Sequence, residues 1–305
     1  MISTQELTSR FGGNAQLHFR ELGEGVVVAE IDNSLATATI SLYGGHVVSW
    51  RPKNQVEPVL WVSNLAQFKL GKAIRGGVPI CWPWFGAHPS NANLPAHGYA
   101  RISPWELDSV RALDNGATEI TLSLSDTDLS REHGSRAVQL SARIAIGASL
   151  EVTLTTTNDG DQPTVMSEGL HTYFKVGDVT KISVLGLDGS EYVDLLCDNL
   201  RCTQVGPVRF EGELGRIYVG NQATCIIQDP LLRRRIHVKK SGSLSTAVWN
   251  PWKRTATKMD DLGPEGWRDM VCVESANALE NFVTVAAGCE HSIAAIYSVE
   301  NLGPF

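Results

Sequence analysis

The chain of 305 residues lacks the apolar segments that membrane insertion and export require. No hydrophobic run approaches the roughly 20 residues that span a bilayer as a helix. The segment from Met1 to Glu21 mixes Gln, Glu, Arg and Asn with scattered apolar side chains and resembles no targeting signal. No Asn-x-Ser/Thr glycosylation site occurs either. We therefore expect no membrane partner and a cytoplasmic location.

The chain also has no excess of positive charge. Its formal net charge is −7, from 26 Lys and Arg against 33 Asp and Glu. Nucleic-acid binders concentrate basic residues on one face, so this balance argues against a nucleic-acid partner. It leaves an anionic small molecule open, because two or three local arginines can override a distant, screened acidic field.

The motifs of metal, nucleotide and redox sites are missing as well. The six cysteines form no CxxC pair, and the eight histidines show neither HExxH nor HxH spacing. No GxGxxG or Walker pattern is present. We therefore predict a protein without a metal or cofactor, whose cysteines are free thiols or small buried hydrophobes.

Period-two alternation of apolar and polar residues dominates what is present, and turn signals such as Gly44-Gly45 and Asp188-Gly189 separate the runs. The clearest runs are 36–42, 120–124, 138–146 and 150–154. This pattern is typical of antiparallel strands with one buried face. Helical patterns are scarce, and the best candidates are Ser63–Phe68 and Pro264–Trp267. We predict an all-β protein, a large antiparallel β-sandwich with few short helices, as a single domain over residues 1–305.

Two ionisable residues stand in strand-like, apolar segments far apart in the sequence. His171 lies in Leu170-His171-Thr172-Tyr173-Phe174, and Glu274 lies in Val271-Cys272-Val273-Glu274-Ser275. A bare imidazole or carboxylate is unfavourable there unless it is paired or used. Together the two groups can move protons in opposite directions on one substrate, which is general acid–base catalysis. Taken alone, however, a single buried histidine is more often a hydrogen-bonded core residue.

Two irregular segments carry cations among Gly, Pro and aromatic residues. The first runs from Ala73 to Gly86 and contains Arg75; the second, from Leu94 to Arg101, contains His97 and ends in an arginine. Loops of this kind on a rigid sandwich are where binding sites usually lie. The plainer alternative is that the arginines are surface ion-pair partners.

Five segments together resemble the aldose 1-epimerase superfamily, and within it most closely the hexose-6-phosphate mutarotases. They are IRGGVPICWPWFG, LPAHGYAR, LHTYFKVGD, WNPW and MVCVESANA. The resemblance runs from about Gly44 to Ile296. It implies a large antiparallel β-sandwich with the active site in a groove on one face, in agreement with the alternation.

The resemblance also implies roles for five residues. His171 matches the general acid that protonates the sugar ring oxygen, and Glu274 matches the base that acts on the anomeric hydroxyl. Arg75 and Arg101 match arginines that bind the substrate and its 6-phosphate, and His97 matches a histidine that contacts the sugar. The implied reaction interconverts the α and β anomers of a hexose 6-phosphate, with glucose 6-phosphate as the expected substrate. Ring opening, rotation about C1–C2 and reclosure require no cofactor.

One stretch departs from the family pattern. Relatives commonly carry an Asp-Arg-x-Tyr element whose Asp contacts sugar hydroxyls, whereas this chain has Gly215-Arg216-Ile217-Tyr218. Either Glu213 reaches into the site, a water fills the gap, or the sugar specificity has changed. The alternative functions are therefore an epimerase of unphosphorylated aldoses and a non-catalytic carbohydrate-binding sandwich. The sequence does not decide the oligomeric state.

Overall fold

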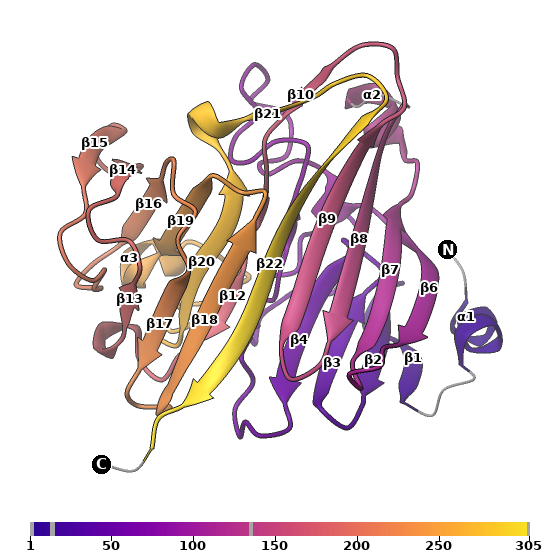
Figure 1. The fold of residues 1–305 in the computed structure, drawn as a ribbon, viewed down its shortest axis with the longest axis horizontal. Helices are drawn as coiled ribbons and strands as arrows, with labels where there is room; N and C mark the ends of the chain where they lie inside the picture. The colour runs from indigo at the N-terminus through magenta and orange to yellow at the C-terminus, as the bar shows by residue number, and fades with distance from the viewer. Residues whose placement is uncertain (1–2, 13–15, 134–136, 304–305) are drawn as a thin grey trace.

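The computed structural model describes residues 3–12, 16–133 and 137–303, and most of its regular structure is strand. The first eight-stranded sheet has the order β13 (Ser183–Leu185), β17 (Cys225–Asp229), β18 (Arg234–Ser241), β22 (Cys289–Asn301), β9 (Leu150–Asn158), β8 (Val138–Ile146), β7 (Thr118–Leu124), β6 (Trp105–Ala112). All pairings between its strands are antiparallel. We call it the front sheet, as Figure 1 shows it.

Two further sheets pack behind it. The site sheet, also eight-stranded, has the order β15 (Leu200–Thr203), β14 (Glu191–Asp194), β16 (Leu214–Tyr218), β19 (Ser245–Asn250), β20 (Met270–Asn277), β11 (Glu168–Leu170), β5 (Ile80–Cys81), and β12 (Tyr173–Lys175) also pairs with β20. The other is four-stranded: β1 (Leu17–Glu21), β2 (Val27–Asp32), β3 (Ala36–Ser41), β4 (His46–Pro52). A separate pair joins β10 (Thr164–Met166) to β21 (Val283–Val285).

The layers meet face to face, as Figure 1 shows. Strand β3 of the four-stranded sheet contacts β8, and β20 of the site sheet contacts β22. In β9, Leu150, Val152 and Leu154 are buried and alternate with half-buried residues. Burial of each such side chain stabilises the fold by roughly 1.5–3 kcal/mol. The predictions of an all-β fold and of an antiparallel sandwich are confirmed.

The short helices lie elsewhere than predicted. They are α1 (Thr4–Phe11), α2 (Asp128–His133) and α3 (Trp252–Ala256), with single 3₁₀ turns η1 (Ala100–Ile102), η2 (Val179–Lys181) and η3 (Leu279–Asn281). The predicted helices at Ser63–Phe68 and Pro264–Trp267 are wrong, because both segments form turns. The Ser63 hydroxyl accepts the Leu65 N–H at 3.0 Å, a local bond that competes with helix formation. No helix among the described residues is long and apolar enough to cross a membrane.

Strand β20 is the longest fully buried strand of the site sheet. All eight of its residues are buried. It pairs with β19 on one side and with β11 and β12 on the other, and the front sheet covers one of its faces. A strand enclosed in this way holds its side chains in fixed positions.

The single-domain prediction stays a prediction.

Candidate active site

A cavity of about 590 Å³ opens over the face of the site sheet that points away from the front sheet, and all five residues predicted for the site line it. They are Arg75, His97, Arg101, His171 and Glu274. The cavity floor is set by strand register, since Ile217, Ala247 and Glu274 are cross-strand partners on β16, β19 and β20. The structure thus brings together residues that come from four separate parts of the sequence.

Glu274 and His171 face each other at the centre of this floor. Glu274 lies on β20, and His171 lies in the short link between β11 and β12 rather than inside a strand. Glu274 Oε1 is 3.4 Å from His171 Nδ1. The side chains are 3% and 10% exposed, respectively. The two groups are therefore a pair held almost free of bulk water.

Burial sets the protonation of this pair. It raises the pKa of Glu274 well above its ordinary value, with the charge of Arg101 acting in the opposite direction. It lowers the pKa of His171 well below 6.5, and the neighbouring charges of His97, Arg101 and Arg75 lower it further. The ligand-free site consequently favours a protonated carboxyl and a neutral imidazole. In this form the pair shares one titratable proton, the same number as a carboxylate beside an imidazolium.

Two polar atoms of the pair have no hydrogen-bond partner among the described residues. They are Glu274 Oε2 and His171 Nδ1, both inaccessible to solvent. Buried polar atoms are almost always satisfied, so two unsatisfied atoms side by side mark this pair as an unusual position.

His97 approaches the same floor from the second loop. Its backbone has φ 63°, and its Nδ1 accepts the N–H of Gly86 at 3.2 Å, so the neutral ring carries its hydrogen on Nε2. Burial, with the charges of Arg101 and Arg75, lowers the pKa of His97 to about 3. Its ring centroid lies 5.3 Å from that of His171. His97 is thus a neutral group beside the pair.

Arg75 is held from several sides. Its guanidinium donates to Asp261 Oδ2 at 3.1 Å and to the Tyr173 hydroxyl at 2.8 Å. Burial disfavours its charge, but Tyr173 and Asp261 outweigh burial and raise its pKa. The two residues that follow it must be glycine: added Cβ atoms would lie 2.4 Å from Trp61 O at Gly76 and 2.3 Å from Val47 O at Gly77, both with positive φ.

His46, which the sequence did not mark as a site residue, anchors this loop. It begins β4, is buried, and its Nε2 bonds the Gly76 carbonyl at 2.7 Å. Burial lowers its pKa to about 4, so the neutral ring donates from Nε2. Its position after a double glycine suggested a turn, and only tertiary packing shows its role.

Arg101 is the less restrained of the two site arginines. It lies in η1 and donates from Nη2 to the Ala96 carbonyl at 2.8 Å. Within the described residues it forms no ion pair, so most of its five donors stay available to an anion.

The far side of the floor is apolar. Gly215 on β16 pairs with Trp249 on β19, and both line the cavity beside Leu195. Glu213 does not reach in, since its carboxylate accepts the Thr255 hydroxyl of α3 at 2.8 Å, outside the cavity lining. The suggestion that Glu213 compensates for Gly215 is therefore wrong.

One group of side chains at the site could offer ligand atoms to a metal. Among the described residues, His171, Cys272 and Glu274 have ligand atoms within 4.8 Å of one another. Metal ligands must be deprotonated, however, and burial raises the pKa of both Cys272 and Glu274 well above their ordinary values. Three arginines, Arg75, Arg101 and Arg216, also line the cavity. The electrostatics of the site do not favour a cation.

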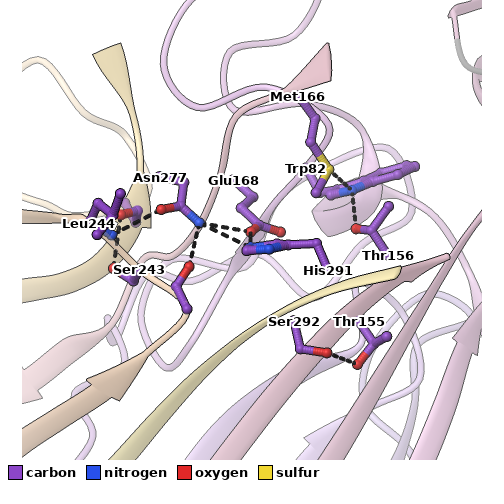
Figure 2. Close-up of polar contacts among 12 residues, drawn as sticks. Trp82, Thr155, Thr156, Met166, Glu168, Ser243, Leu244, Asn277, His291 and Ser292 are labelled. Atoms are coloured by element: carbon purple, nitrogen blue, oxygen red, sulfur yellow. Dashed lines mark hydrogen bonds and ion pairs between the residues drawn. The ribbon is translucent and has the colours of Figure 1, made fainter. Parts of the chain in front are cut away.

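A second acid–base pair, of a buried glutamate and a half-buried histidine and absent from the sequence analysis, lies at the other end of the β11–β20 pairing (Figure 2). Glu168 Oε1 lies 2.9 Å from His291 Nε2 and accepts from Asn277 Nδ2 at 3.0 Å. Because His291 belongs to β22, this pair bridges the site sheet and the front sheet. None of the three residues lines the cavity, which separates this cluster from the site.

The antiparallel sandwich and the acid–base pair on the cavity floor are the features expected of a sugar epimerase. Comparison with known proteins supports this class. The aldose 1-epimerase family matches residues 28–298. The chain therefore belongs to the aldose 1-epimerase family and is an isomerase.

Individual relatives are more specific. An Escherichia coli K12 protein named as a candidate glucose-6-phosphate 1-epimerase is 36% identical over 251 residues, covering 82% of this chain and 83% of that protein. A Cenchrus ciliaris protein of the same name is 35% identical over 264 residues, covering 83% and 78%. The crystal structure of a candidate mutarotase from Salmonella typhimurium has a TM-score of 0.87 at 32% identity, covering 95% of each chain.

Proposed function

We propose that this protein interconverts the α and β anomers of a hexose 6-phosphate, with glucose 6-phosphate as the substrate. The observation that carries this proposal is the one-proton pair of Glu274 and His171 on a cavity floor that arginines border. The names of the relatives support the same substrate. A cytoplasmic location is part of the proposal, because a charged sugar phosphate does not pass through a bilayer unaided.

In the proposed reaction, Glu274 is the base and His171 is the acid. Glu274 removes the proton from the C1 hydroxyl, the bond from C1 to the ring oxygen breaks, and His171 protonates that oxygen. The open aldehyde rotates about C1–C2 and closes with the roles reversed, so both protons return and no other reactant is consumed.

The ligand-free protonation requires one preparatory step. The proton favoured on Glu274 must move to His171, whose Nδ1 is 3.4 Å from Oε1. A substrate hydroxyl that donates to the Glu274 carboxylate stabilises its charge and so drives this transfer. Substrate binding would thereby create the base and the acid together.

The phosphate is proposed to bind at the arginine end of the cavity. Arg101 supplies free donors in a planar fork that matches phosphate oxygens. Arg75 is already paired with Asp261 and therefore contributes mainly a fixed charge and a fixed loop. This pairing is also the observation that favours the second candidate, an epimerase of neutral aldoses, in which both arginines serve the structure.

The two candidates differ in the effect of Arg101→Ala. A lost hydrogen bond to a charged group is worth about 1.5–3 kcal/mol, so we expect kcat/KM for glucose 6-phosphate to fall roughly 10- to 150-fold. Turnover of glucose should change little. Arg101→Lys keeps the charge but loses the planar guanidinium. Its kcat/KM for glucose 6-phosphate should lie between those of wild type and Arg101→Ala.

The measurement is anomer exchange by NMR on glucose 6-phosphate and on glucose, with wild type and both variants. Equal loss on the two sugars would contradict the phosphate role of Arg101. Exchange of glucose alone by the wild type would favour the second candidate.

A further inference from the structure

Gly215 is a glycine that the backbone does not require. It lies inside strand β16 and its φ is outside the left-handed region. A Cβ added there would meet only ordinary contacts, with Leu195 Cβ at 3.7 Å, Leu196 Cγ at 3.8 Å and Trp249 Cδ1 at 3.8 Å. Glycine within a strand weakens it and often marks a place that a ligand approaches. The consequence of this glycine is room in the cavity.

A neighbouring glycine shows the contrast. A Cβ added to Gly169 on β11 would lie 2.8 Å from the ring of Phe85, so packing requires that glycine. At Gly215 the nearest added contact is almost an ångström longer. Packing therefore requires a glycine at position 169, whereas packing does not require one at position 215.

The room beside Gly215 has apolar walls. The cavity lining near it includes Leu195 and Trp249, with Ile217 two residues further along β16. Arg216 also borders the cavity, but its Nη1 donates to Gln204 Oε1 at 3.0 Å and its guanidinium stacks on Tyr192 at 4.5 Å, so its charge is engaged elsewhere. Of the side chains that line this end, the Trp249 indole and the Arg216 guanidinium can only donate, so a sugar hydroxyl here finds no side-chain acceptor.

The sheet order says which part of the sugar faces this end. This step rests on the proposed function. Across the floor, β16 is followed by β19, by β20 with Glu274, by the link with His171, and then by the loops with the arginines. With C1 at Glu274, the ring oxygen at His171 and the 6-phosphate at the arginines, carbon 2 points toward β16. Two strand spacings, about 10 Å, separate β20 from β16, where Ile217 lies level with Glu274 and Gly215 lies two residues further along.

We propose that Gly215 and its apolar walls determine specificity at carbon 2 of the sugar phosphate. The enzyme accepts hexose 6-phosphates whether carbon 2 carries a hydroxyl, a hydrogen or an acetamido group. The hydroxyl finds no side-chain acceptor there, and the acetamido methyl group finds both room and apolar contacts.

The test measures anomer exchange by NMR on glucose 6-phosphate, 2-deoxyglucose 6-phosphate and N-acetylglucosamine 6-phosphate. Wild type should turn over the 2-deoxy compound with kcat/KM within about threefold of glucose 6-phosphate, and the N-acetyl compound within about tenfold. Gly215→Asp adds an acceptor and fills the room, so it should favour glucose 6-phosphate over both analogues by at least about tenfold more than wild type does.

Two further variants keep the test decisive. Gly215→Ala adds only a methyl group and should slow the N-acetyl compound selectively, even if the aspartate disturbs folding. Gly212→Asp makes the same change at a glycine that does not line the cavity and has nothing within 4 Å of an added Cβ, so its ratios should match wild type.

Three outcomes are informative. Selectivity that shifts in the Gly215 variants and not in Gly212→Asp supports the proposal. Exchange of glucose 6-phosphate with unchanged ratios in the Gly215 variants, or a wild type that prefers glucose 6-phosphate by more than about 100-fold, overturns it and leaves the proposed function intact. Absence of exchange with all three phosphates overturns the proposed function itself, and this inference with it.

Discussion

Replacement of Glu274 by Gln isolates its proton chemistry from its packing. Glutamine has nearly the same shape, and Glu274 Oε2 has no hydrogen-bond partner to lose among the described residues. The carboxyl is almost fully buried, and burial opposes its charge. Removing the ionisable group should therefore leave the fold intact, and thermal unfolding should occur at or above the wild-type temperature.

The expected effect on catalysis is large. A positioned general base typically contributes on the order of 10²–10⁴-fold, so kcat for glucose 6-phosphate should fall by about that factor. This corresponds to a barrier raised by roughly 2.7–5.5 kcal/mol. KM should change less, because the arginines and His97 remain in place.

The assay is magnetisation exchange between the two anomer signals, corrected for the spontaneous rate measured without enzyme. Glu168→Gln is the matched control, because Glu168 is also a fully buried carboxyl of the site sheet but lies outside the cavity. It should keep kcat within about threefold, well short of a general-base loss. Retention of wild-type kcat by Glu274→Gln would refute the assignment of the base.

Three other predictions concern protonation and the loop. In the ligand-free protein, NMR titration of the His171 ring should show no protonation near pH 6.5, because burial lowers its pKa; a midpoint near 6.5 would contradict this. The hydrogen bond that His291 donates to Glu168 raises the pKa of His291. The stabilising contribution of this pair is therefore complete below about pH 6.5 and is lost as pH rises through the higher folded-state pKa. The difference in free energy of unfolding between wild type and His291→Gln, from urea titrations, should therefore shrink with rising pH, and a constant or growing difference would be inconsistent with the pair. Gly77→Ala should destabilise the fold by about 1–3 kcal/mol or more, because its Cβ would lie 2.3 Å from Val47 O at φ 65°; an unchanged urea midpoint would disprove the constraint.

The strands could be predicted from the sequence because the alternation of apolar and polar residues within each strand shows which of its faces is buried. The apolar positions predicted between 138 and 146 are the side chains that β8 turns toward the core, with Val138 at the margin. Helices of five to eight residues carry too few turns for a clear period, and so α1, α2 and α3 were all missed while two turns were taken for helices.

The site likewise contains residues that the sequence identifies and contacts that only the structure shows. His171 and Glu274 were found by their unusual neighbours and by the family resemblance, and their proximity depends on the antiparallel register of β11, β12 and β20. The anchoring of Arg75 by His46, and the pairing of Glu168 with His291, each join elements distant in the chain. No local pattern records such contacts, and so only the folded structure reveals them.

The complete burial of β20 has a consequence for how this protein would lose activity on heating. Local opening is easiest at exposed segments with few apolar contacts, and a central strand opens only with the whole domain. The carboxyl of Glu274 should therefore stay in place until the cooperative transition. Early heat inactivation would instead come from the largely exposed residues 87–96, whose Ala96 carbonyl holds Arg101, by way of weakened substrate capture, and would reverse on cooling.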